Sequence, residues 1–164
     1  MIRTHSCSNC FSPLGHRPAA SASIIGSNKY PNIRGTADFY QTESGVVVAA
    51  EITGLPTSDN RCESPVFGFH IHSGTCCSGN ASDPFANAIT HYNPDNCLHP
   101  YHAGDLPPLF ENQGYAKMSV LTDRFIVEEL IGKTVVIHSM ADDFTSQPAG
   151  NAGEKIACGI IMKE

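Results

Sequence analysis

Eight residues with side chains suited to metal binding stand in three short segments of the chain. GFHIH (68–72) contains two histidines, THYNPDNCLHPYHAGDLP (90–107) contains three, and VVIHSMADD (135–143) contains one. The candidates are His70, His72, His91, His99, His102, Asp105, His138 and, in a supporting position, Asp142. Imidazole nitrogens and carboxylate oxygens bind divalent transition metals. Because six of the chain's 8 histidines fall in these segments, the sequence predicts a site for two metal ions.

Three of the histidines are expected on strands. His70 and His72 stand two residues apart, so their side chains project from one face of a strand while Ile71 points to the other face, toward the core. His138 alternates in the same way within TVVIHS. Imidazoles presented by two rigid strands are typical of a preorganised transition-metal site.

The other ligands are expected on a loop. His99, His102 and Asp105 follow one another at intervals of three, and His91 is the obvious fourth ligand for the tetrahedron that zinc prefers. If His91 also serves the strand histidines, each of its ring nitrogens must bind a different ion. Either pattern alone often occurs by chance, and an HxH pair is usually surface histidine. Their combination carries the prediction.

The segments that would position these residues have strand character. They are 33–42, 45–55, 65–73, 114–123, 133–140 and 155–162, with strand signals starting at about residue 22. Residues 125–132 favour a short helical turn, and 74–113 and 141–154 are rich in Gly, Pro, Asn and Asp. The sequence predicts an all-β fold, an antiparallel Greek-key sandwich or flattened barrel of about eight strands with two long functional loops. The absence of a crossover helix argues against a parallel sheet.

Composition limits the functional classes. The chain has 164 residues, 41% hydrophobic and 16% charged, which predicts one domain over 21–164 after a flexible arm at 1–20. A net charge of -6 argues against nucleic acid as a partner, and no apolar run is long enough to cross a membrane. The start of the sequence does not resemble a signal peptide, so a cytoplasmic location is expected, and a trimmed leader would make the protein secreted.

The 7 cysteines leave at least one thiol outside any intramolecular pairing. In a chain that is not secreted, cysteines are usually reduced thiols or metal ligands.

Five segments resemble the copper–zinc superoxide dismutases, and specifically the bacterial type. GFHIH, HYNP, HAGDLP, VVIHSMADD and GNAGEKIACG occur in family order, and the likeness extends over about residues 33–163. The resemblance implies a β-sandwich that uses copper and zinc. It also implies an oxidoreductase that converts two superoxide anions and two protons to dioxygen and hydrogen peroxide, by cycling copper between two oxidation states.

The resemblance also implies roles for individual residues. The copper ligands would be His70, His72, His91 and His138, and the zinc ligands would be His91, His99, His102 and Asp105. His91 would bridge the ions and act in catalysis, and Asp142 would join His70 to His99. Cys158 would form a disulfide with Cys76 or Cys77, and the bacterial spacing favours Cys77.

The chain departs from the family pattern at three places. Lys155 replaces the active-site arginine, which keeps a catalytic positive charge for the anionic substrate but loses the planar guanidinium. The loop between His99 and His102 is several residues shorter than in the eukaryotic enzymes. The residues His5, Cys7, Cys10 and His16 have no family counterpart, so this arm either acquires metal or is a plain tail.

Two other functions fit the same residues. A non-catalytic metal carrier or copper chaperone would use the fold without turnover, and only the HxCxxC arm favours it. A zinc-only or copper-only structural domain would follow if the shortened loop could not hold zinc. The sequence leaves open whether the protein forms a homodimer.

Overall fold

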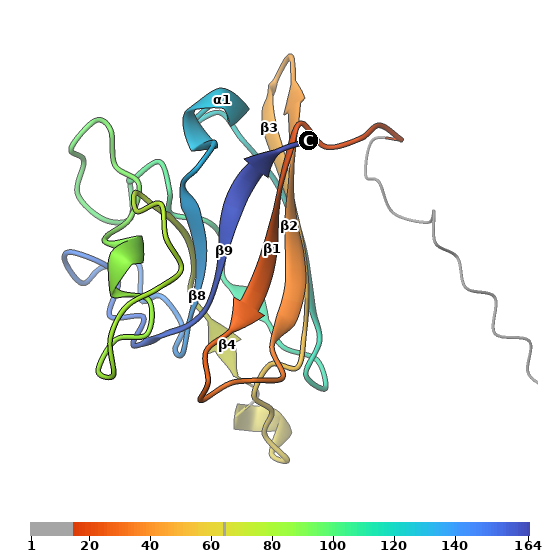
Figure 1. Cartoon of the computed structure of the whole chain (residues 1–164). Coiled ribbons are helices and arrows are strands. Elements are labelled where there is room, and N and C mark those ends of the chain that lie inside the picture. Colours follow the sequence, from red (N-terminus) through yellow and green to blue (C-terminus); the bar gives the residue numbers. More distant parts are fainter. Residues whose placement is uncertain (1–14, 64) are drawn as a thin grey trace, which may run out of the picture.

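Seven antiparallel strands form one curled sheet in the computed structural model, which describes residues 15–63 and 65–164 (Figure 1). Their order across the sheet is β5-β8-β9-β1-β2-β3-β7. Their bounds are β1 Ala20–Gly26, β2 Arg34–Thr42, β3 Gly45–Thr53, β5 Phe69–His72, β7 Ala116–Thr122, β8 Thr134–His138 and β9 Lys155–Lys163. A second, two-stranded sheet consists of β4 (Val66–Phe67) and β6 (Leu109–Phe110). The short helical elements are η1 (Arg61–Glu63), η2 (Ala86–Ala88) and α1 (Val127–Leu130).

The fold class predicted from the sequence is confirmed. Nearly all of the regular secondary structure in the described residues is β. β9 returns by a long connection to lie beside β1, and β7 and β8 lie toward opposite ends of the sheet, which is a Greek-key arrangement. The predicted strands correspond to β2, β3, β5, β7, β8 and β9, and the predicted helical turn contains α1. β1 begins at Ala20, two residues before the expected start of strand structure. The proposed arm lies mostly at residues 1–14, outside the described part of the chain.

The core follows the alternation of apolar residues along the strands. In β3, Val46, Val48, Ala50 and Ile52 are buried and the residues between them are more exposed. β8 differs because all five of its residues are buried. One of its faces contacts the core and the other lies under the long loops. Both faces of β8 are therefore covered by other parts of the chain.

The long loop after β5 folds back along that strand. Isolated bridges pair His72 with His91 and His70 with Asp105. The backbone N–H of Ile71 donates a hydrogen bond to the carbonyl of Gly104 over 2.9 Å. A Cβ at Gly104 would collide with the carbonyl oxygen of Ile71. Glycine at this position therefore allows the loop backbone to approach β5 closely enough to bring loop ligands beside strand ligands.

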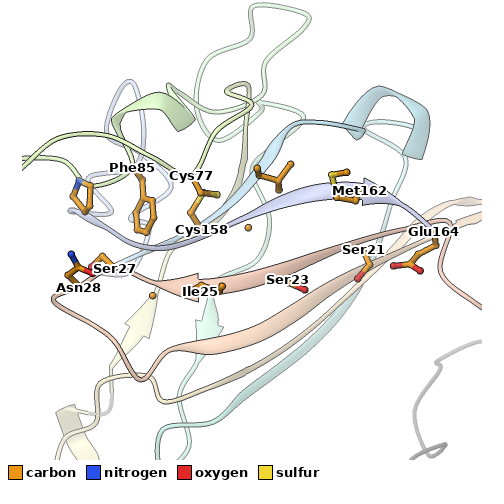
Figure 2. A pocket seen from close by; sticks show the side chains of 14 residues that line it. Ser21, Ser23, Ile25, Ser27, Asn28, Cys77, Phe85, Cys158, Met162 and Glu164 are labelled. Carbon is orange, nitrogen blue, oxygen red and sulfur yellow. A yellow bond between two sulfur atoms is a disulfide. The ribbon is translucent and has the colours of Figure 1, made fainter.

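A disulfide fixes the start of this loop to β9. Cys77 is the partner of Cys158, and Cys76 is an exposed free thiol. Figure 2 shows the bond beside Phe85, on the side of the molecule where β1 and β9 run. Phe85 belongs to a small buried cluster with Val136 and Cys158. The bond and the aromatic ring together hold the loop against the sheet. No helix in the described part of the chain is long and apolar enough to cross a bilayer.

We expect Cys77→Ser to lower the free energy of unfolding by about 4 kcal/mol, because the bond closes a large loop of the unfolded chain. The two cysteines are separated by 81 residues. Urea unfolding of the metal-free protein measures the change, and Cys76→Ser is the matched control that should leave stability unaltered. Equal destabilisation by both substitutions would contradict this prediction.

Candidate metal centre

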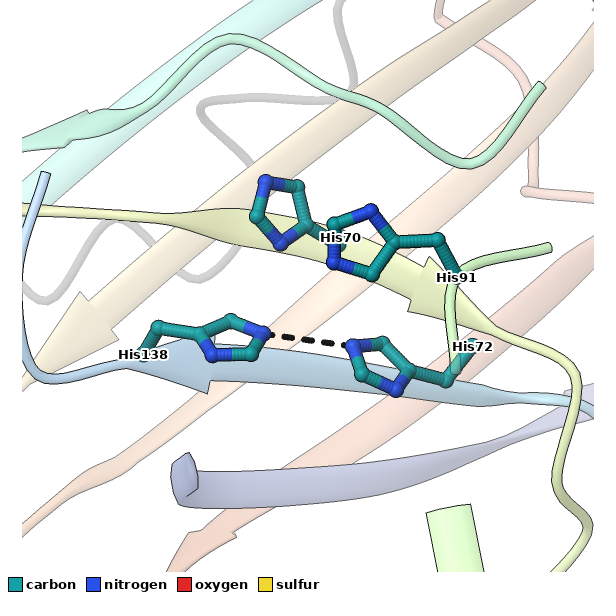
Figure 3. A group of neighbouring side chains, drawn as sticks. All are labelled: His70, His72, His91 and His138. Atoms are coloured by element: carbon teal, nitrogen blue, oxygen red, sulfur yellow. Dashed lines mark hydrogen bonds between the residues drawn. The ribbon is translucent and has the colours of Figure 1, made fainter. Parts of the chain in front are cut away.

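Four histidine side chains converge at the end of the sheet between β5 and β8. His70 and His72 of β5 and His138 of β8 meet His91 of the long loop, and their ligand atoms all lie within 4.8 Å of one another (Figure 3). All four are buried, with His138 the most exposed at 5%. The faces are those expected from alternation, since Ile71 and Ile137 point into the hydrophobic core.

The nitrogens that face the middle of this group carry lone pairs. Nδ1–H of His72 and Nδ1–H of His138 each donate over 3.3 Å to a backbone carbonyl, those of Ile89 and Gly153. A carbonyl only accepts, so each Nε2 is left with its lone pair, and these two atoms are 3.2 Å apart. Nδ1 of His70 and Nε2 of His91 are buried without a hydrogen-bond partner. Buried lone pairs that face one another are stabilised by a cation, so this donor set fits a metal ion.

Burial keeps the imidazoles of His70, His72 and His138 neutral, which is the form that binds metal. Burial lowers the pKa of His70 and His72, and it lowers that of His138 to about 3. Neighbouring imidazoles add to the shift because two positive rings would repel each other.

A second group lies on the other side of His91. His91, His99, His102 and Asp105 also have ligand atoms within 4.8 Å of one another. Nδ1 of His91 donates to Asp105 Oδ1 over 2.7 Å and lies 3.3 Å from Nδ1 of His102. Nδ1 of His99 lies 3.0 Å from Asp105 Oδ2 but has no hydrogen bond. Three nitrogens and a carboxylate at these separations fit a tetrahedral zinc ion.

Asp105 is ionised in this group. Burial alone would raise its pKa, but the hydrogen bond from His91 and the nearby imidazoles lower the pKa below its ordinary value. Burial lowers the pKa of His102. The group therefore combines a carboxylate with the ring nitrogens of three histidines. His91 belongs to both groups, with Nδ1 directed to the second and the unpartnered Nε2 remaining for the first.

The carboxylate of Asp142 links a histidine of the first group to a histidine of the second. Nε2 of His70 donates to Asp142 Oδ2 over 2.7 Å, and Nε2 of His99 donates to Asp142 Oδ1 over 2.9 Å. These bonds leave the Nδ1 lone pair of each ring directed at its own group. A Cβ on Gly150 would collide with the Asp142 carboxylate and the His99 ring, so only glycine fits there. Burial raises the Asp142 pKa, but hydrogen bonds from His70, His99 and the Phe144 backbone lower it well below the ordinary value.

Lys155 lies in a pocket of about 360 Å³ beside the first group. His72, His91 and His138 line the pocket together with Asp83 and Lys155. Lys155 Nζ is 2.5 Å from Asp83 Oδ2, so its charge has a partner. The sequence analysis did not single out Asp83, because it stands in an irregular segment with no pattern that relates it to Lys155.

Two other contributors were also missed. Nη1 of Arg124 donates to the carbonyls of Pro100, His102 and Asp105 over 3.2 to 3.3 Å, which ties the loop of the second group to the segment after β7. The Gln147 side chain donates to the His99 carbonyl over 2.7 Å and accepts from the His99 N–H over 3.0 Å. Bonds to backbone carbonyls and N–H groups leave no signature in spacing or composition.

Some candidate residues are not brought into either group. His16 is exposed near the start of the described chain, and His5, Cys7 and Cys10 lie outside the described residues. Among the described cysteines, Cys62, Cys76 and Cys97 are exposed free thiols.

Comparison with known proteins gives one consistent result. The family model of copper/zinc superoxide dismutase (SODC) matches residues 33–161. Superoxide dismutase [Cu-Zn] 2 of Aquifex aeolicus is 33% identical over 157 residues, covering 87% of this chain and 85% of that protein. The [Cu-Zn] enzyme of Legionella pneumophila is 31% identical over 159 residues, covering 92% and 91%.

A solved structure supports the fold independently. The Cu/Zn superoxide dismutase from Brucella abortus superposes with a TM-score of 0.71 at 23% identity, covering 86% of this chain and 98% of that one. Family match, relatives and fold agree over most of the sequence. The chain belongs to the copper/zinc superoxide dismutase family.

Proposed function

We propose that the protein is an active superoxide dismutase, with copper held by the first group and zinc by the second. The copper ligands are His70, His72, His91 and His138, and the zinc ligands are His91, His99, His102 and Asp105. One observation carries the proposal: the two ring nitrogens of His91 face two different sets of ligand atoms.

The donor sets suit the two metals differently. Imidazole nitrogens can bind copper in both oxidation states, and three nitrogens with one carboxylate match the ligands that zinc prefers. When bound, copper supplies the one-electron chemistry that oxidises one superoxide and reduces another. Zinc has no redox chemistry, so the role of a zinc ion in the second group would be to hold the His91 ring in place.

The protein's own residues position ligands and handle protons. Nε2 of His91 is the only nitrogen of that ring that is not committed to the second group, so it is the atom that can hold a proton for the peroxide product. Asp142 fixes the rings of His70 and His99, and the carbonyls of Ile89 and Gly153 fix those of His72 and His138. Such support prevents the rings from turning during turnover.

The substrate would approach through the pocket that contains Lys155. An anion meets long-range repulsion from a chain of net charge -6, which salt screens, and local attraction from bound cations. Lys155 is the only lysine or arginine among the residues that line this pocket.

Metal analysis combined with a superoxide-consumption assay tests the proposal. We expect one copper and one zinc per chain and turnover that cyanide abolishes, because cyanide binds copper. Tight copper binding without turnover indicates a metal carrier, and binding of a single metal without turnover indicates a structural domain. Either result would rule out the proposed activity.

We expect Asp142→Asn to weaken metal binding by about 10- to 100-fold, because an amide cannot accept hydrogen bonds on both sides. Competition with a coloured chelator measures the affinity for zinc. Asp143→Asn is the matched control, since the exposed Asp143 accepts hydrogen bonds only within its own turn, from Thr145 and Ser146. Equal affinities for the two variants would remove Asp142 from the site.

We expect Lys155→Glu to slow the reaction with superoxide by about five- to tenfold at low ionic strength, because the charge beside the path changes by two units. Lys155→Arg keeps the charge and should change the rate less. Pulse radiolysis measures both, and equal rates would exclude Lys155 from the mechanism.

The cytoplasmic location stays a prediction from the sequence. The second point to be measured is whether the protein forms a homodimer. A Cys77–Cys158 disulfide is more typical of an oxidising compartment than of the cytosol. Cell fractionation of the native protein decides the first point, and sedimentation analysis decides the second.

A further inference from the structure

The ammonium group of Lys155 is already engaged by a carboxylate. Its Nζ lies 2.5 Å from Asp83 Oδ2, and the side chains are 15% and 36% exposed. Of the charged residues that line the pocket, Glu154 is held from outside by Lys29 at 2.5 Å and by Tyr30 at 2.8 Å. Lys155 is the only lysine or arginine among the lining residues, and the carboxylate of Asp83 offsets its charge.

Asp83 is placed in this position by the fold of its own segment. Its Oδ1 accepts a hydrogen bond from the Phe85 N–H over 3.0 Å, and its backbone N–H donates to Asn80 Oδ1 over 3.0 Å. Its carbonyl accepts from the N–H groups of Asn80 and Ala86. The disulfide at Cys77 and the buried ring of Phe85 fix both flanks of the residue. The carboxylate is thus preorganised toward Lys155.

Stability does not account for such an arrangement. Ion pairs that are partly exposed contribute little to the free energy of unfolding, because solvent screens the charges and both side chains lose conformational entropy. Their effect on an approaching ion is larger, because a charge at the mouth of a pocket changes the local concentration of the ligand. The pair therefore bears on the passage of anions more than on the fold.

We propose that Asp83 is a rate- and specificity-determining residue, whose carboxylate competes with the anionic substrate for Lys155 at the mouth of the copper pocket. This inference rests on the proposed function. The carboxylate offsets the charge of the ammonium group and occupies one of its three N–H donors, so Asp83 weakens the attraction of Lys155 for every small monoanion. Asp83 has no part in the chemistry itself.

The test compares Asp83→Asn with Asp59→Asn in the copper- and zinc-loaded protein. Asp59 is exposed and precedes η1, which lies well apart from the segment around Asp83 in Figure 1, and the substitution changes net charge equally. Two quantities are measured at low and high ionic strength: the second-order rate constant with superoxide, by pulse radiolysis, and the dissociation constant of azide, by optical titration of the copper band.

We expect Asp83→Asn to raise the rate constant and to tighten azide binding by about two- to fivefold at low ionic strength, with both gains shrinking in high salt. Asp83→Glu keeps the charge and should behave like the parent. In a Lys155→Gln background, Asp83→Asn should give less than half of its gain, because the competition no longer exists.

Three results would overturn the inference. One is an unchanged or lower rate constant and unchanged azide binding in Asp83→Asn, which would make Asp83 a support that merely orients Lys155. Another is an equal gain in Asp59→Asn, which would make the effect one of total charge. The third is an equal gain with and without Lys155. A loaded parent protein that does not consume superoxide defeats the proposed function instead, and the azide titration still tests Asp83 separately.

Discussion

The arrangement depends on one imidazole that is shared by two sets of ligand atoms. An imidazole ring has only two nitrogens, and each nitrogen of His91 faces other potential metal ligands. Asp105 and His102 lie near Nδ1, and the strand histidines lie on the side of Nε2. Its position is fixed by the bridge between His72 and His91, which aligns the loop with β5. If that loop moved away from the strand, both groups would lose a ligand together.

The fold was largely predictable from the sequence because alternation and turn residues are local signals. Val46, Val48 and Ile52 define the buried face of β3, and a tight turn at Glu43 and Ser44 separates it from β2. The faces of His70, His72 and His138 follow from the same period of two. The start of β1 was harder to place, because its small residues Ala20, Ser21 and Ala22 carry little strand preference and are defined by pairing with β2 and β9.

The loop contacts were less predictable because they depend on tertiary structure. No spacing rule links Arg124 to the carbonyls that it contacts, or Asp83 to a lysine that follows it by 72 residues. The resemblance favoured Cys77 over its neighbour as the partner of Cys158, whereas counting cysteines could not choose between them. Residues that support a site through the backbone are generally invisible to motif analysis, since any residue offers the same carbonyl.

The segment from Cys77 to His91 is anchored at both ends, by a covalent bond to β9 and by the bridge to β5. Between these anchors no residue belongs to either ligand group, although the carbonyl of Ile89 orients the His72 ring and Phe85 packs against Val136 and Cys158. The carboxylate of Asp83, which pairs with Lys155 in the pocket, thus lies on a part of the chain that supplies none of the proposed ligands. Evolution can adjust what enters the centre while its interior stays the same.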